Sequence, residues 1–186
     1  IVELFFSEKI YAGERNYHFD GKISRKVLEN YLDHSITMQG FLHDEKSDPY
    51  LTKAQREDNI RMVINTGAKF IGRAFCVYGN EPVLVDQITK AEPLIKKIHD
   101  LDPDIILQGT LFECITNNVN NVPVPEWVFR EFLLEPEKRN FNYSVMLYPD
   151  GSRVNQWGNG SSVPDIKQLE TRMWFFYIAA RYIDVG

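Results

Sequence analysis

Three long apolar segments constrain the fold of this chain more than any other feature. They are nearly continuous in apolar residues, as expected for parallel strands that are covered on both faces. Each segment is separated from the next by a helical pattern, and this alternation is typical of right-handed βαβ units. The three segments are Ser35–Leu42, Lys69–Tyr78 and Asp104–Ile115.

The two helical patterns between these segments have recognisable ends. The first covers residues 53–66, where Thr52 is a good N-cap, Gln55 completes a capping box and a glycine supplies the C-terminal stop. The second covers Val85–Leu101, and Pro93 within it is expected to kink or split the helix. A helix is the usual connection between parallel strands, so both patterns agree with a parallel sheet.

Further helices and one long irregular region lie outside this central pattern. Pro125 is expected at the first position of a short helix. Residues 135–162 form a region long enough to be functional or disordered, and their aromatic residues favour order. The other predicted elements are helices over Ser24–Leu32 and Pro164–Ile183, and a segment Val2–Phe6 that is either a strand or an edge that pairs with a partner.

These elements predict an α/β fold in which parallel βα units form a partial, incomplete TIM-type barrel. The 186 residues form a single domain in this interpretation. A closed eight-stranded barrel usually needs about 200 to 250 residues or more. We therefore expect residues 1–186 to be a fragment of a larger (β/α) barrel domain.

Composition excludes several classes of function. The net charge of −5 argues against a nucleic-acid partner, because phosphate binding needs an excess of Lys and Arg. No apolar run approaches the roughly 20 residues of a membrane span, so no membrane association is expected. The histidines are scattered and no phosphate-binding glycine loop is present, so neither a metal nor another cofactor is expected. The two cysteines favour buried free thiols, and the cellular compartment stays open.

A polar residue interrupts each of the three apolar segments, namely Gln39, Arg73 and Gln108. If the faces that carry them point into a barrel, these side chains meet near its lumen and orient a substrate there. A buried arginine is costly unless it is paired, so Arg73 would need a carboxylate or a ligand oxygen. The alternative is an internal hydrogen-bond network. Strand alternation groups each residue with its neighbours as Thr37, Gln39 and Phe41; Ile71, Arg73 and Phe75; and Ile106, Gln108 and Thr110.

Acidic and aromatic residues follow the predicted strands at their carboxyl ends, where parallel barrels build their active sites. Glu113 and Asp44 are the candidate catalytic carboxylates, because a pair of carboxylates can serve glycoside hydrolysis. Tyr78 is a candidate for substrate binding, and Trp157 on the long irregular region could stack on a sugar ring. The alternatives are ordinary acidic loop residues and, for Trp157 and Tyr148, a loop that packs its own small core.

Several distinctive strings lie along the chain from about Ser24 onward. They are Ser35–Gln39, Asp58–Met62, Thr66–Ala74, Pro125–Phe129, Arg139–Tyr143, Met146–Gly151, Ser162–Asp165 and Glu170–Phe175. In these strings the chain resembles a group of largely uncharacterised bacterial glycoside-hydrolase-like proteins with a TIM barrel. The resemblance implies that the chain is an N-terminal or excised part of a larger barrel.

Three hypotheses of function follow from the sequence. In the first, the chain is a glycoside-hydrolase-like barrel segment that acts on or binds a carbohydrate. In the second, it is a non-catalytic module that binds a carbohydrate or a protein. In the third, it is a structural half-barrel whose open sheet edges pair with a second copy or with a missing barrel half.

Overall fold

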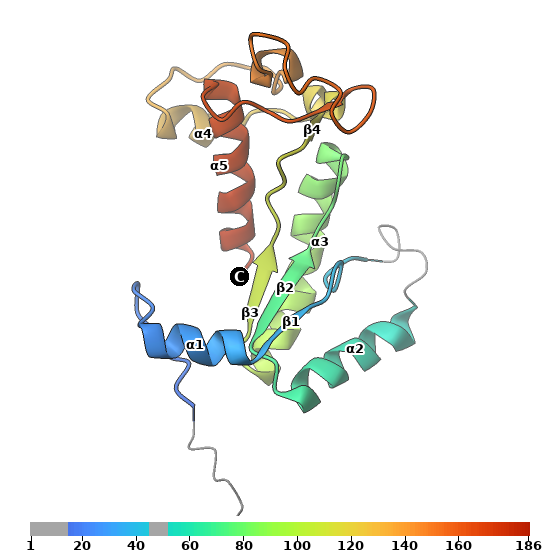
Figure 1. Ribbon diagram of the computed structural model, residues 1–186, viewed down its shortest axis with the longest axis vertical. Helices are drawn as coiled ribbons and strands as arrows, with labels where there is room; N and C mark the ends of the chain where they lie inside the picture. Colours follow the sequence, from blue (N-terminus) through green and yellow to red (C-terminus); the bar gives the residue numbers. More distant parts are fainter. Residues whose placement is uncertain (1–14, 45–51) are drawn as a thin grey trace, which may run out of the picture.

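A three-stranded parallel sheet forms the centre of the computed structural model, which describes residues 15–44 and 52–186. The strands lie in sequential order, β1-β2-β3, and both neighbouring pairs are parallel (Figure 1). The predicted parallel βα units are therefore confirmed. Over the described residues the sheet is open and no closed barrel is formed. The strands are β1 (Ser35–Thr37), β2 (Phe70–Phe75) and β3 (Ile106–Gly109), and the segment Val2–Phe6 lies outside the described residues.

The helices around the sheet begin and end largely where their capping residues predict. The capping box of Thr52 and Gln55 is present, and Gly67 ends the same helix in the left-handed conformation with φ of 68°. No helix in the described ranges is long and apolar enough to cross a membrane. The helices of this half are α1 (Arg25–Asp33), α2 (Lys53–Thr66) and α3 (Glu81–Leu101).

Helix α3 differs from the prediction in two ways. It begins four residues earlier than Val85, because Pro82 is well tolerated in the first turn of a helix. It also continues through Pro93 without being split. Pro93 is exposed to solvent, so water can satisfy the carbonyl group that loses its helical hydrogen bond.

The strands are shorter than the apolar segments that predicted them. β1 ends at Thr37, although the backbone beyond it still donates to β2, from Met38 N to Gly72 O at 3.0 Å and from Leu42 N to Ala74 O at 2.9 Å. The third segment is divided into β3 and a separate strand β4 (Ile115–Thr116). β2 ends at Phe75, so the chain beyond Thr110 has no parallel neighbour to pair with.

One face of the sheet carries the core of this half. The side chain of Ile71 is fully buried, and Ile36 and Leu107 are its partners in the same row across the sheet. Helices α2 and α3 cover this face, and Figure 1 shows α3 behind the strands. The buried residues that join the sheet to the two helices are Ile60, Val63, Ile71, Ala74, Ile88, Ala91, Ile95 and Ile98.

The C-terminal part forms a second packed region above the sheet in Figure 1. Phe141 is buried against Trp174 and Tyr177, with ring centroids 5.2 Å and 5.8 Å apart. The irregular region 135–162 is thus ordered by its own aromatic residues, as the sequence favoured. Strand β5 (Ser161–Ser162) pairs antiparallel with β4. The other elements of this part are η1 (Asn117–Asn121), α4 (Glu126–Glu131), η2 (Tyr143–Met146) and α5 (Leu169–Asp184).

Helices α4 and α5 both begin later than predicted. Pro125 is the N-cap of α4, so it precedes the first helical position instead of occupying it. The start of α5 lies five residues beyond Pro164, because Asp165 forms a turn there. Its carboxylate accepts hydrogen bonds from Lys167 N and Gln168 Nε2, both at 3.0 Å. These bonds give the backbone a stable alternative to a helix.

Candidate functional site

The face of the sheet opposite the helices is polar and open. A Cβ atom at Gly72 would lie 3.3 Å from Thr37 Oγ1 and 3.6 Å from Gln108 Oε1, so these groups share that face. Both Thr37 and Gln108 are exposed. Gln39 is also exposed, in the turn that follows β1. The structure therefore places Thr37 and Gln108 together, as alternation predicted for these two strands.

The backbone of β2 is irregular at Arg73. The predicted alternation of this strand and the predicted burial of Arg73 are both wrong. Arg73 has a φ of 57°, and the register between β2 and β3 shifts between Ile71 and Phe75. The side chains of β2 therefore do not alternate regularly between the two faces of the sheet. Ile71 faces the helices and does not share a face with Arg73. Arg73 was expected to be buried, but it is exposed. Its backbone N–H donates to Gln108 Oε1 at 3.0 Å, which holds the two predicted polar residues side by side.

The side chain of Arg73 reaches an aromatic pair beyond the ends of β2 and β3. Its guanidinium carbon lies 5.7 Å from the centroid of the Phe112 ring, and Nη2 lies 3.8 Å from Cys76 Sγ. Phe112 in turn packs edge-on against Tyr78, with ring centroids 5.2 Å apart. Arg73 forms no ion pair with any described residue. An exposed arginine over an aromatic ring is therefore available to an anion from solution.

Glu113 lies at the same end of the sheet as Arg73, as the predicted site requires. It is exposed, and its negative charge acts on the phenol of Tyr78. Partial desolvation raises the pKa of Tyr78 to about 12, with smaller contributions from the Cys114 thiol and from Glu113. Tyr78 itself is 53% exposed. We call the group at this end of the sheet the rim; its members are Arg73, Tyr78, Gln108, Phe112 and Glu113.

The electrostatic contact between Glu113 and Tyr78 can be measured directly. Replacing Glu113 with Gln removes a negative charge that opposes ionisation of the phenol, so the pKa of Tyr78 should fall from about 12 while staying above its ordinary value. The difference between the tyrosinate absorbance titrations of the protein and of its Tyr78→Phe variant isolates this group. An unchanged pKa of Tyr78 in the Glu113→Gln protein would place Glu113 away from the rim.

The structure places the other two predicted site residues, Asp44 and Trp157, after β1 and beside β5. Asp44 is half-buried after β1, and its charge contributes to a raised pKa of Lys90 in α3, after the larger effect of Asp86. Trp157 is 47% exposed in a turn next to β5, which pairs with β4 shortly after Glu113. The pairing of Asp44 with Glu113 as two catalytic carboxylates stays a prediction.

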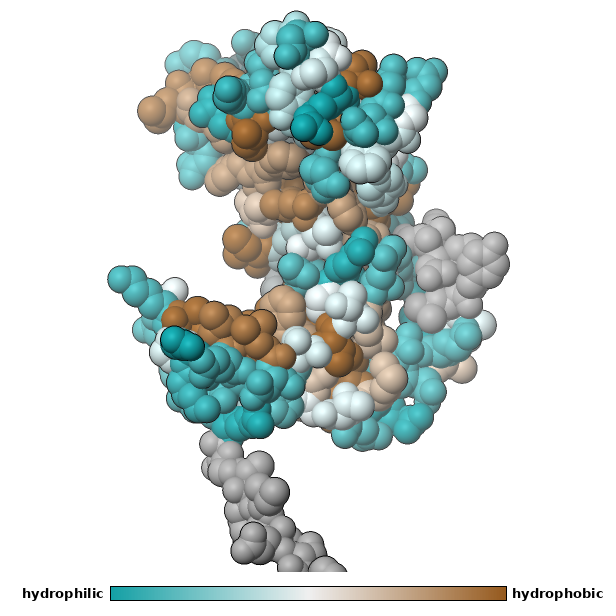
Figure 2. Space-filling model, in the orientation of Figure 1, coloured by the Kyte–Doolittle hydropathy of each residue, from teal (hydrophilic) through white to brown (hydrophobic). Residues whose placement is uncertain are grey.

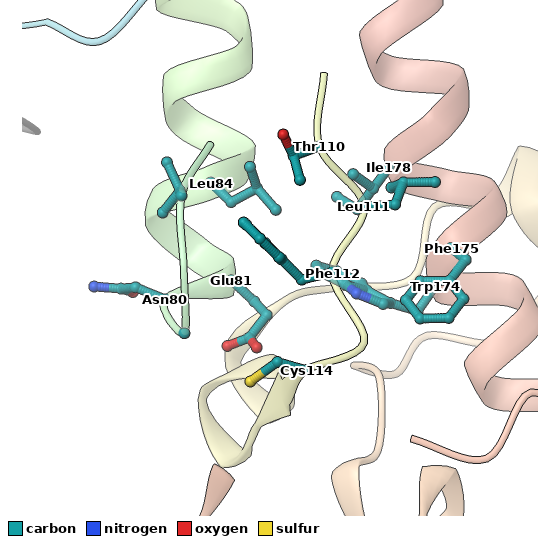
Figure 3. Close-up of a pocket in the computed structure, with 12 residues that line it drawn as sticks. Asn80, Glu81, Leu84, Thr110, Leu111, Phe112, Cys114, Trp174, Phe175 and Ile178 are labelled. Carbon is teal, nitrogen blue, oxygen red and sulfur yellow. The ribbon is translucent and has the colours of Figure 1, made fainter. Parts of the chain in front are cut away.

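A small, partly open cavity lies beneath the rim, between α3, the segment that follows β3, and α5 (Figure 3). Its volume is about 30 Å³, which is room for about one water molecule. Phe112 lies across it between Leu84 of α3 and Trp174 of α5. A sugar does not fit in such a cavity, so a ligand of this size would bind on the open surface of the rim.

Two buried carboxylates, Glu81 and Glu170, have partners that no local sequence pattern reveals. Glu81 accepts from Thr116 N at 2.7 Å and from Thr116 Oγ1 at 2.5 Å, and so attaches β4 to the start of α3. Glu170 accepts from both terminal nitrogens of Arg139, at 2.6 Å and 3.0 Å. Acidic residues in the first turn of a helix are a usable signal, but their partners are distant in sequence. Both carboxylates are fully engaged and hold the fold together.

The fold and the rim define a mixed α/β protein with an open parallel sheet and a polar site at the carboxyl ends of its strands. No family model, curated protein or solved structure matches this chain. Within the described ranges, no group of three or more His, Cys, Asp or Glu side chains could hold a metal ion. The chemistry open to the site is that of the rim side chains: anion binding, hydrogen bonding and proton transfer.

Proposed function

We propose that this chain is the opening part of a parallel (β/α) barrel of the glycoside-hydrolase-like kind, and that its rim acts on or binds a carbohydrate. The observation that carries the proposal is the convergence of Arg73, Tyr78 and Glu113 at the carboxyl end of a parallel sheet. Active sites of parallel barrels are built from that end. In the proposed role, Glu113 is the acid or base, and Arg73 and Gln108 orient the sugar.

Two features support the partial barrel. The strands follow sequential order, and right-handed crossovers between such strands place the helices on one face, as in a barrel. In addition, Leu28 and Leu32 of α1 are 42% and 59% exposed, and Figure 2 shows an apolar stripe over this helix. Further strands that close the sheet would cover both the open face and this stripe.

The composition of the rim supports a carbohydrate ligand. Tyr78 in the rim and Trp157 in the turn beside β5 offer exposed aromatic surfaces, which can pack against the C–H face of a sugar. Gln39, Gln108 and Arg73 supply exposed donors and acceptors for hydroxyl groups. The non-catalytic binding module is the second candidate, because the same groups bind a sugar without a second carboxylate.

Binding of oligosaccharides tests the proposal. We expect Trp157→Ala to weaken binding of the best ligand in a glycan array by about tenfold, since loss of a stacking platform costs on the order of 1 kcal/mol or more. Trp127→Ala is the matched control, because Trp127 is similarly exposed, at 39%, but packs on α5 away from the rim. Absence of binding to any glycan, or equal losses in both variants, would count against a carbohydrate site.

Light scattering separates the structural half-barrel from the other hypotheses. A half-barrel that needs a partner should form a homo-oligomer, because its sheet edges and the face of α1 are uncovered. A monodisperse monomer that binds glycans would favour the carbohydrate hypotheses. A stable dimer without glycan binding would favour the structural one.

A further inference from the structure

The backbone at Arg73 directs a cationic side chain out of the sheet. Its φ of 57° lies in the left-handed region, which residues other than glycine adopt rarely. The conformation is held by two hydrogen bonds, from Arg73 N to Gln108 Oε1 at 3.0 Å and from Gly40 N to Arg73 O at 3.2 Å. Uncommon backbone conformations that are fixed by their surroundings cluster at ligand sites.

The guanidinium of Arg73 is held in place by its neighbours, but no described carboxylate balances its charge. Phe112 lies 5.7 Å away and Cys76 Sγ 3.8 Å away, and no described carboxylate pairs with it. The planar ring restricts the guanidinium on one side, and among the described contacts only its Nη2 has a side-chain acceptor, Cys76 Sγ. A guanidinium fixed in this way matches the geometry of a carboxylate, to which arginine can donate two parallel hydrogen bonds.

The polar groups around Arg73 can form hydrogen bonds with the hydroxyl groups of a sugar ring. Gln108 Oε1 is occupied by the backbone of Arg73, so the amide nitrogen of Gln108 is the group left to meet a ligand oxygen. Thr37 Oγ1 lies on the same open face, and the phenol of Tyr78 lies beside Phe112. The phenol of Tyr78 carries its proton at neutral pH, as tyrosine ordinarily does, and can donate a hydrogen bond to a hydroxyl group.

We propose that the rim selects an acidic sugar, with Arg73 binding the carboxylate of a uronic acid residue while Gln108 and Tyr78 contact its hydroxyl groups. This inference rests on the proposed carbohydrate function and names its substrate class. A protein with a net charge of −5 repels anions in general, so selection of an acidic sugar depends on this local cation. Arg73 is then the residue that determines specificity.

The test compares sugars that differ only in charge. Oligosaccharides containing galacturonate or glucuronate are titrated beside their methyl esters, in which the carboxylate is neutral, and binding is followed by ligand-observed NMR. The intact protein should bind the best acid at least tenfold more tightly than its ester. Arg73→Gln should reduce this ratio to near one, and Arg73→Lys should leave an intermediate ratio because lysine keeps the charge but not the bidentate geometry.

Arg153 offers a matched control within the same chain. It is also exposed, has a φ of 59° and forms no ion pair with a described residue, but it lies outside the rim. Arg153→Gln should therefore keep the preference for the acid. Equal binding of acid and ester would overturn the inference and leave the carbohydrate function standing. If the protein binds neither the acid nor the ester, both the inference and the proposed carbohydrate function are overturned. Displacement of the acid by equimolar acetate would show a site for any carboxylate and overturn the assignment of a sugar ligand.

Discussion

Replacing Glu113 with Gln should reduce turnover of a glycoside by the intact protein about 10²-fold to 10⁴-fold, which is the usual contribution of a general acid or base. The amide keeps the size of the side chain but can neither give nor take the proton in the pH range of the reaction. Glu113 is exposed at the rim, so its replacement leaves the core intact. Reducing-sugar release, measured for both proteins at saturating substrate, checks the prediction.

The control for this experiment is the Glu92→Gln variant. Glu92 is an exposed carboxylate in the middle of α3, far along the helix from the rim. Turnover by this variant should be unchanged. Binding of the substrate should persist in the Glu113→Gln protein, because the groups proposed to hold the sugar are Arg73, Gln108 and Tyr78. Full activity of the Glu113→Gln protein would remove Glu113 from the mechanism and leave the non-catalytic module as the better hypothesis.

Replacing Glu170 with Ala should lower the free energy of unfolding by about 3 kcal/mol, because the buried carboxylate accepts two hydrogen bonds from the charged Arg139, and hydrogen bonds to charged groups contribute about 1.5 to 3 kcal/mol each. The side chain of Glu170 is only 8% exposed, and it also accepts from Asn142 N at 2.9 Å. Hydrogen bonding with Glu170 holds the pKa of Arg139 above its ordinary value. The variant therefore loses at once the links from Glu170 of α5 to Arg139 and to Asn142.

Thermal and denaturant unfolding measure this effect, and Glu137→Ala is its control. Glu137 pairs with the same Arg139, at 3.4 Å from its Nε, but its side chain is 67% exposed. Exposed ion pairs contribute about 0 to 1 kcal/mol, so the control should change stability little. For a chain of this size a loss of about 3 kcal/mol corresponds to a fall in Tm of roughly 6 to 12 °C. Equal effects in the two variants would show that burial of Glu170 does not strengthen the pair.

Local sequence signals predicted much of the first half of the fold. Thr52, Gln55 and Gly67 predicted the bounds of α2, because a cap depends on residues within one turn of the helix. The three apolar segments predicted parallel strands covered on both faces; the parallel direction is confirmed, but over the described residues one face of the sheet is open. The same reasoning placed Arg73 and Glu113 at one end of the sheet, because parallel strands end at a common edge.

Other features depended on contacts that no local pattern contains. The third apolar segment is divided because β2 ends at Phe75 and gives the chain beyond Thr110 no parallel neighbour. The bond between Gln108 and the backbone of Arg73 joins residues that are 35 positions apart. The pair of Arg139 with the buried Glu170 spans 31 positions. Such pairings form only when the whole chain is folded, so patterns of neighbouring residues cannot reveal them.

The sequence by itself determined the class of fold, the parallel direction of the strands and the end of the sheet where the polar residues gather. Periodicity and capping specify these properties, and both act over a few residues. Only the tertiary structure decided that Arg73 is exposed over Phe112 and that Ile71 faces the helices. A single left-handed residue in β2 reverses the alternation of the strand, and hydrogen bonds from two neighbouring segments hold it in that conformation.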